Sequence, residues 1–281
     1  MTSPHLTLAA LTILLTLGTG AHAQTGRAAS RATPSPAALE VARMGFVEGG
    51  VEVQRPGGGW TRAAENEPLS MGDRVRTLPG GTARLEFPWT AIAVGDGTEV
   101  SLQKNRVLTL ELLQGRLDID PEQSLLRILT EEAAISGSGR TLVRREGGTT
   151  FVGSYSGGAE VEGKGKVVRR GINKGTLASA SGPAEPQPLG PAPRVVSPSA
   201  DPRYVRPGQP VALKWAGKEK AYHLEVLSID SDVPVMSLDL DGASHDLRLN
   251  WLGTFRWRVS GRSGPVESEP SGEGLICVVE K

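Results

Sequence analysis

Histidine, the first residue to consider for a metal site or a catalytic base, is scarce in this chain of 281 residues. Beyond the N-terminal segment there are two, His223 and His245, and neither has a cysteine or another histidine at metal-ligand spacing. Both lie in stretches that alternate apolar and polar residues, so we expect them on surface strands. Gly153–Gly157 reads Gly-Ser-Tyr-Ser-Gly, with tyrosine where a nucleophile elbow needs serine. The sequence therefore predicts no metal site and no nucleophilic serine.

Two carboxylates offer another possible chemistry. Asp118 and Asp120 flank Ile119 and would share one face of a strand. Paired carboxylates divide the acid and base roles of glycoside hydrolysis when their environments differ. Asp120 also precedes Pro121, which is an ordinary way to end a strand, and we expect that role. Gly163–Lys166 lacks the third glycine of a dinucleotide loop and the Ser or Thr of a phosphate loop. We predict no enzyme activity and no cofactor.

A basic segment is the remaining candidate for a site. On neighbouring strands its side chains could form a basic surface for an anionic glycan, a wall polymer or a lipid headgroup. The alternative, which we favour, is a solvated sheet face on which lysine protects an edge strand from aggregation. The candidate binding residues are Arg140, Arg144, Arg145, Lys164, Lys166, Arg169, Arg170 and Lys174.

Composition indicates a turn-rich β protein. The chain has 36 glycines and 20 prolines but only 4% aromatic residues, and it is long enough for about two domains. Its formal net charge is zero, so no overall field favours nucleic acid as a partner.

The N-terminus is typical of an export signal. Leu6–Leu17 is a short apolar run followed by Ala21–Ala23, an A-x-A pattern, so we expect residues 1–23 to be a cleaved signal peptide. Residues 24–40 are small, polar and proline-containing, and we expect a disordered leader. No later run is long enough to span a bilayer, so we expect a periplasmic or secreted protein without an integral membrane segment after cleavage.

Gly72–Leu102 sets the pattern that the first part of the chain repeats. Apolar and polar residues alternate in short bursts that end at Pro79–Gly81 and Gly95–Gly97, where glycine supplies the positive φ of tight turns. Similar bursts recur through residues 41–176. They predict an all-β domain, a many-stranded sandwich or roll, with a short β-solenoid as the alternative.

The second part of the chain follows a different pattern. Residues 177–193 contain five prolines from Pro183 onward, and we expect an extended linker outside any β ladder. Residues 194–281 then hold about seven strand patterns, the size of a seven-stranded immunoglobulin-like sandwich. Cys277, the single cysteine, lies in an apolar run and should be a buried, unreactive thiol.

The motifs of the first domain resemble those of the FecR domain. Its pattern is a Gly-Asp-x-Val-x-Thr segment, a Gly-x-Ala-x-Leu strand and an Asp-Gly-Thr turn, found here at Gly72–Thr77, Gly81–Leu85 and Asp96–Thr98. The resemblance covers residues 41–175 and weakens at Gly139–Thr141, where the family usually has Gly-Thr followed by a valine-rich strand. It implies an envelope module. The FecR sigma regulator itself needs a cytoplasmic segment and a membrane helix, which we do not expect here.

The second domain is similar to fibronectin type III and related sandwiches. Leu252–Val259 resembles the Pro-Gly-Thr-Tyr-Tyr-Trp-Arg-Val strand of such modules, with Phe255 in place of a tyrosine.

Three functions follow as hypotheses. The leading one is a non-catalytic exported binding or scaffold protein that contacts an envelope protein or a cell-wall glycan. The alternative is a periplasmic signal-sensing component of a FecR-type regulatory system. The weakest is a glycan hydrolase that uses Asp118 and Asp120.

Overall fold

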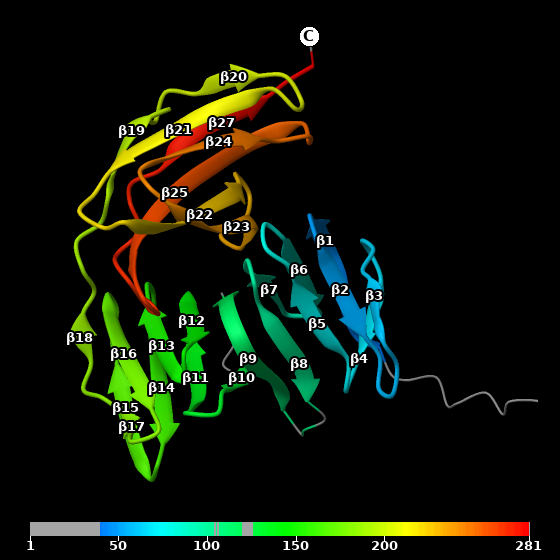
Figure 1. Cartoon of the computed structure of the whole chain (residues 1–281), viewed down its shortest axis with the longest axis vertical. Helices are drawn as coiled ribbons and strands as arrows, with labels where there is room; N and C mark the ends of the chain where they lie inside the picture. Colours follow the sequence, from blue (N-terminus) through cyan, green and yellow to red (C-terminus); the bar gives the residue numbers. More distant parts are fainter. Residues whose placement is uncertain (1–39, 104, 106, 120–125, 281) are drawn as a thin grey trace, which may run out of the picture. The chain divides into compact units, whose positions relative to one another are not determined.

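The computed structural model describes residues 40–103, 105, 107–119 and 126–280, and in them the chain is all-β, without a helix (Figure 1). The predicted signal peptide, all but the last residue of the predicted leader, and Asp120 lie outside the described residues. No helix that could cross a membrane is found in the part of the chain that is described. The described residues form one compact unit.

The first module consists of two sheets that share strand β9. Sheet A runs β4-β1-β6-β7-β9-β12-β13-β16 with β17 and β18 beside β16, and sheet B runs β3-β2-β5-β8-β9-β10-β11-β14-β15. Apart from the parallel pair β9–β10, the described strands of this module pair antiparallel, as in the predicted sandwich. The strands are β1 (Glu40–Glu48), β2 (Val51–Gln54), β3 (Trp60–Arg62), β4 (Pro68–Ser70), β5 (Arg74–Thr77), β6 (Thr82–Phe87), β7 (Thr90–Val94), β8 (Glu99–Gln103), β9 (Leu108–Ile119), β10 (Leu126–Leu129), β11 (Ala134–Ser138), β12 (Thr141–Glu146), β13 (Thr149–Ser154), β14 (Gly158–Gly163), β15 (Lys166–Arg170), β16 (Lys174–Ser179), β17 (Gly182–Pro183) and β18 (Gln187–Pro188).

The apolar side chains that alternate along the strands of Gly72–Leu102 lie in one core between the two sheets, as predicted, whereas Leu78 and Trp89 are exposed. Val75, Leu85 and Ile92 are fully buried there. The turns form at the expected glycines, with φ of 77° at Gly80 and 60° at Gly97.

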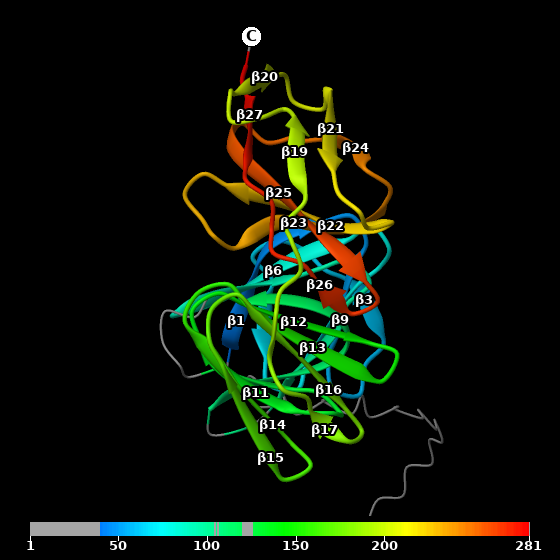
Figure 2. The ribbon, with the colours of Figure 1, turned by 90° about the vertical axis from the view of Figure 1, so that its left-hand side faces the viewer.

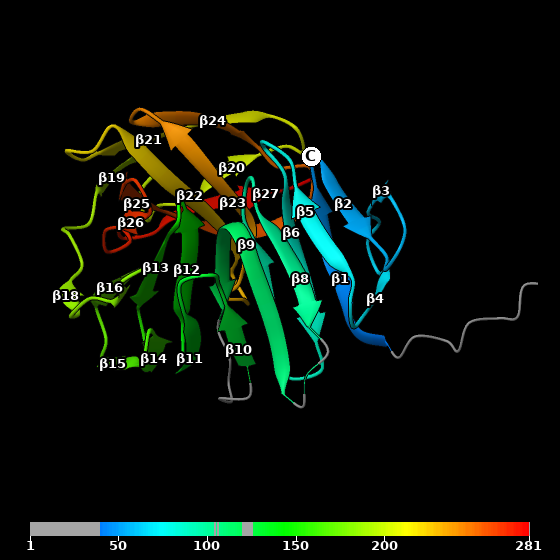
Figure 3. The same ribbon diagram turned by 60° about the horizontal axis from the view of Figure 1, so that its bottom comes forward.

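Strand β9 passes from one sheet to the other. Its first half pairs with β8 and β10 in sheet B, and its second half pairs with β7 and β12 in sheet A (Figure 3). The change occurs at a bulge, where Val100 faces Leu112 but Glu99 faces Gln114. Gly115 follows with φ of 88°, a conformation that glycine adopts without a steric penalty. This corner sets the face on which the rest of β9 presents its side chains.

The second module contains the predicted strand patterns and two further short strands, β20 and β26. Sheet C runs β19-β21-β24, and sheet D runs β20-β27-β25-β22-β23 with β26 beside β25. Trp215, Tyr222 and Trp257 pack together in its core, with ring centroids 5.6 and 6.3 Å from that of Trp215. Cys277 is buried, as predicted. The strands are β19 (Arg194–Ser197), β20 (Arg203–Val205), β21 (Pro210–Ala216), β22 (Ala221–Ser228), β23 (Pro234–Asp241), β24 (Ser244–Arg248), β25 (Gly253–Ser263), β26 (Val266–Glu267) and β27 (Gly274–Val278).

The prediction that residues 177–193 stay outside the ladders is wrong at its start. The first three complete β16, and β17 and β18 pair with that strand despite their prolines. Proline is tolerated at a sheet edge, where its missing N–H is not needed. The residues after these prolines supply the bonds instead: the N–H of Ala184 donates to Leu177, and that of Leu189 donates to Asn173.

Substituting Gly115 should test the corner in β9. A Cβ there would overlap Thr98, in addition to the cost of a positive φ, so we expect Gly115→Ala to lower the free energy of unfolding by about 2–4 kcal/mol. Gly97→Ala is the matched control, because its φ is also positive but a Cβ would meet no atom within 4 Å, and we expect about 1 kcal/mol. Urea unfolding measures both, and equal losses would show that the overlap with Thr98 does not matter.

Candidate functional site

The outer face of sheet A carries charged side chains. On β9 and β12, Leu117 and Val143 point into the core of the first module, so their neighbours Arg116, Asp118 and Arg144 point to the opposite face. Arg116 and Arg144 lie directly opposite each other on the two strands. Two like charges side by side require counter-charges, because adjacent like charges destabilise a sheet.

A matching charged face lies on sheet D of the second module. Leu224 of β22 points into that module's core, so His223 and Glu225 point away from it. Arg258 faces Glu225 across the strand pair, and Glu267 lies on the short strand β26. Strands β22, β25 and β26 lie next to the first module (Figure 2). Ion pairs connect the charged faces of the two modules.

Arg116 is the centre of this contact. It is 1% exposed and binds carboxylates from both modules. Its Nε and Nη2 each donate to Asp118 at 2.7 Å, and Nη2 also donates to Glu225 at 2.6 Å. Nη1 donates to Glu267. One guanidinium on β9 therefore joins β22 and β26, whose carboxylates lie 109 and 151 positions further along the chain.

Two further arginines bind Glu225. Arg140 donates from Nη2 to both carboxylate oxygens, at 3.0 and 2.7 Å, and Arg258 donates from Nε. The side chain of Arg140 also lies over the ring of Tyr155, 4.8 Å from its centroid. Glu225 is thus surrounded by guanidinium groups from both modules.

Arg144 forms the other half of the contact. Its Nε donates to Glu267 at 2.8 Å, and its two terminal nitrogens donate to Asp239 at 2.7 and 2.8 Å. His223 lies beside this pair, with Nδ1 2.6 Å from Asp239 and Nε2 2.9 Å from the hydroxyl of Ser237. A ring that donates to Asp239 and accepts from Ser237 satisfies both contacts.

We call this cluster the ionic junction. Although burial favours the neutral acid, the arginines around Glu225 hold its pKa well below the ordinary value, and Arg116 and Arg144 lower the pKa of Glu267. The pKa of Asp239 is lowered by its partners in the same way. The members of the ionic junction are Arg116, Asp118, Arg140, Arg144, His223, Glu225, Asp239, Arg258, Arg262 and Glu267.

Asp118 differs from the other acids. Burial raises its pKa more than Arg116 lowers it, and the negative charge of Glu225 adds to the rise. The side chain is 3% exposed and both its oxygens are held by Arg116, so a glycan has no access to it. Nothing in this geometry supports hydrolysis by Asp118.

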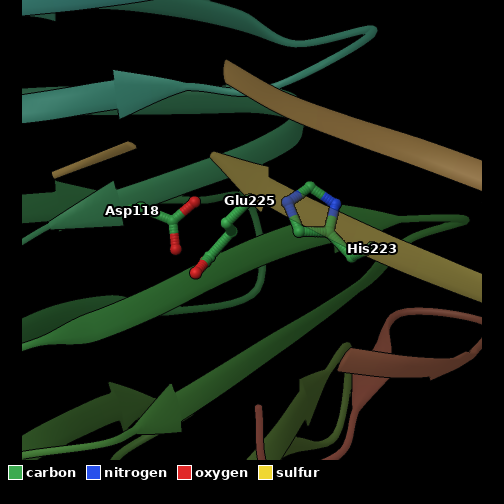
Figure 4. A group of neighbouring side chains, drawn as sticks. All are labelled: Asp118, His223 and Glu225. Atoms are coloured by element: carbon green, nitrogen blue, oxygen red, sulfur yellow. The ribbon is translucent and has the colours of Figure 1, made fainter. Parts of the chain in front are cut away.

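Asp118, His223 and Glu225 are close enough to suggest a metal site. Their potential ligand atoms lie within 4.8 Å of one another, and Figure 4 shows Glu225 between the other two. The carboxylate oxygens, however, already accept hydrogen bonds from arginine. Arg116, Arg140 and Arg258 surround the carboxylates of Asp118 and Glu225, so a divalent cation there would lie next to three positive charges. The donor set fits ion pairing better than metal binding.

Half of the predicted basic segment does not lie on a common basic surface. Arg140 and Arg144 belong to the ionic junction, and Arg145 donates to Glu132 at 2.9 Å. Arg170 is 5% exposed. The prediction of a solvent-facing basic surface is wrong for these four residues. Three of them bind carboxylates, and Arg170 is buried.

The other half of the segment is exposed. Lys164 lies in the turn between β14 and β15, and Lys174 begins β16. Lys166 and Arg169 each pair with a glutamate, at 2.9 and 2.8 Å. These four match the solvated face that we favoured.

The expectation of a surface position is wrong for His223, which is 1% exposed. The sequence does contain a signal for the ionic junction. Arg116-Leu-Asp118 and His223-Leu-Glu225 place pairs of charges on the non-core face of apolar strands. We expected His223 on a surface strand, because alternation shows only that a side chain leaves its own core.

Comparisons with known proteins give weak similarities of fold. No family model and no curated protein matches the chain. Two structures of a candidate anti-sigma factor from Parabacteroides distasonis match at 16% identity, with TM-scores of 0.37 and 0.36; each match covers 41% of this chain and 59% of the other, so the chain spans about three fifths of that protein. The FN1–FN3 domains of chicken CNTN1 match at 10% identity and a TM-score of 0.26, over 86% of this chain and 95% of theirs.

Neutralising Glu267 should show how much the ionic junction contributes. Glu267→Gln leaves Arg116 and Arg144 short of one counter-charge in a buried site, so we expect a loss of about 3–5 kcal/mol in the free energy of unfolding. Glu160→Gln is the control, because its pair with Arg169 is exposed and should contribute less than about 1 kcal/mol. Similar losses for the two variants in urea unfolding would contradict a central role for the junction.

The acids of the ionic junction should make stability depend on pH. The pKa of Asp239 is lowered in the folded state, so its contribution is complete above an unfolded pKa of about 4 and is lost as pH falls further. The stability deficit of Asp239→Asn should therefore be constant from pH 7 to about 5 and shrink below about pH 4.

Asp118 should change the stability in the opposite direction as pH falls. Because its pKa is raised, the wild type should gain stability relative to Asp118→Asn as pH falls from 7 toward the unfolded value. Urea midpoints from pH 7 to 3 measure both trends, and parallel pH profiles for wild type and both variants would refute this assignment of charges.

Proposed function

We propose that this chain is a non-catalytic, exported binding or scaffold protein of the cell envelope. Its FecR-like first module would contact an envelope protein or a cell-wall glycan, and its fibronectin-like second module would serve as a spacer or second contact. The observation that carries the proposal is the ionic junction. The clustered acids and bases of both modules, which could otherwise perform chemistry, bind one another and hold two β modules in one unit.

The export signal predicted from the sequence and the repeated strand–turn motifs support this proposal. The exposed remainder of the basic segment, Lys164, Lys166, Arg169 and Lys174, offers positive charge to an anionic wall polymer. This contact would be weak and sensitive to salt, since exposed charges are screened within about 8 Å at physiological ionic strength.

A second candidate is a periplasmic signal-sensing component of a FecR-type regulatory system. The ionic character of the junction favours it, because contacts between ionised groups respond to pH and to competing charge. An apolar contact would not respond in that way. Deletion of the gene would then alter envelope-stress or iron-responsive transcription, and unchanged transcription would count against this candidate.

Retention assays test the leading proposal. The immobilised mature protein should retain an envelope protein from detergent extracts or co-sediment with purified wall material. Lys164→Glu combined with Lys174→Glu should weaken the wall contact, because it replaces exposed positive charge with negative charge. Lys218→Glu combined with Lys220→Glu makes the same change in an exposed loop of the second module and should leave the contact intact. Retention of neither wall polymer nor protein by the wild type would overturn the proposal.

A further inference from the structure

Arg170, at the end of β15, is a buried arginine outside the ionic junction. Arg170 is 5% exposed, and its Nη1 donates to the carbonyl oxygen of Val152. Nε and Nη2 have no hydrogen-bond partner among the described residues, and no described carboxylate forms an ion pair with it. Arg116 and Arg144, in contrast, each bind at least two carboxylates.

Two buried hydroxyl groups lie on the strands around Val152, whose carbonyl oxygen Arg170 contacts. Thr176 faces Val152 across the pair β13–β16, and Ser154 follows Val152 by two residues on the same face of β13. Thr176 is 1% exposed and Ser154 is fully buried, and within the described part of the chain neither hydroxyl has a hydrogen-bond partner. The carbonyl contact places the Arg170 head group over this part of β13.

The chemistry of these groups points to a negative ligand. A guanidinium has five N–H donors and no acceptor, and each hydroxyl can donate once. Burial lowers the pKa of Arg170 to about 9, so the group still carries a positive charge near neutral pH. A buried charge without a counter-charge is costly, and a buried polar atom without a partner adds to that cost.

We propose that Arg170, Ser154 and Thr176 form an internal binding site for a small monovalent inorganic anion of the size of chloride. Nε and Nη2 of Arg170 supply the charge and two donors, and the two hydroxyls complete the shell. The three residues are at least nine-tenths buried between the sheets, so larger anions such as gluconate do not enter. The site is separate from the ionic junction, and it does not depend on the proposed envelope function.

Thermal unfolding of the mature protein at pH 7 tests the site, with sodium chloride compared against sodium gluconate at equal ionic strength. At a chloride concentration about ten times the Kd, we expect Tm to be higher in chloride by about 3 °C or more. Arg170→Met should abolish the difference. Arg169→Met should preserve it, because Arg169 is the exposed neighbour that pairs with Glu160.

A milder variant and a direct measurement complete the test. Thr176→Val removes one donor while keeping the shape of the side chain, and it should reduce the chloride effect even if Arg170→Met fails to fold. Crystals soaked in bromide should show an anomalous peak beside Nη2 of Arg170. Equal Tm values in the two salts, a chloride effect unchanged by Thr176→Val, or no bromide peak beside Arg170 would each overturn the proposal.

Discussion

The burial of the Arg116 guanidinium is the constraint on which the structure depends. Moving such a charge out of water costs several kcal/mol unless it is matched by carboxylates at hydrogen-bond distance. Asp118 comes from its own strand, but Glu225 and Glu267 come from the second module, so the match exists only when the modules are joined. Buried ion pairs contribute little net stability relative to apolar packing, whereas a broken pair is costly. We therefore interpret the ionic junction as a device that specifies which faces of the two modules meet.

Sheet A consequently has two buried faces of opposite character. Its inner face packs apolar side chains against sheet B, and its outer face presents charges to sheet D. Two further contacts join the modules around the charges. The N–H of Asp96 donates to the carbonyl oxygen of Ser237 at 3.1 Å, and the rings of Phe46 and Trp251 pack edge to face with their centroids 4.8 Å apart. The corner at Gly115 matters to both faces, because it sets the direction of Arg116 immediately after it.

The all-β class and the strands of the second module could be predicted from alternation, because Leu224 and Val226 follow the period of a half-buried strand. The same logic located the turn glycines. It could not locate the ionic junction, because the period gives the face of His223 and Glu225 but not what covers that face. Arg144 and Arg170 were predicted as surface charges for the same reason. Their hydrogen-bond partners lie on strands distant in sequence, and no local sequence pattern predicts which distant strands come into contact.

The sequence distance across the ionic junction has a consequence for the order of folding. Arg116 and Glu267 are separated by 151 positions, and chains fold from the N-terminus as they are made. The first module can complete its apolar core before β26 exists, since that core contains no residue of the second module. Its arginines then face water until the last strands arrive. Closure of the junction is thus a late step of folding, and the nascent chain passes through a stage in which its first module is formed but is not yet joined to the second.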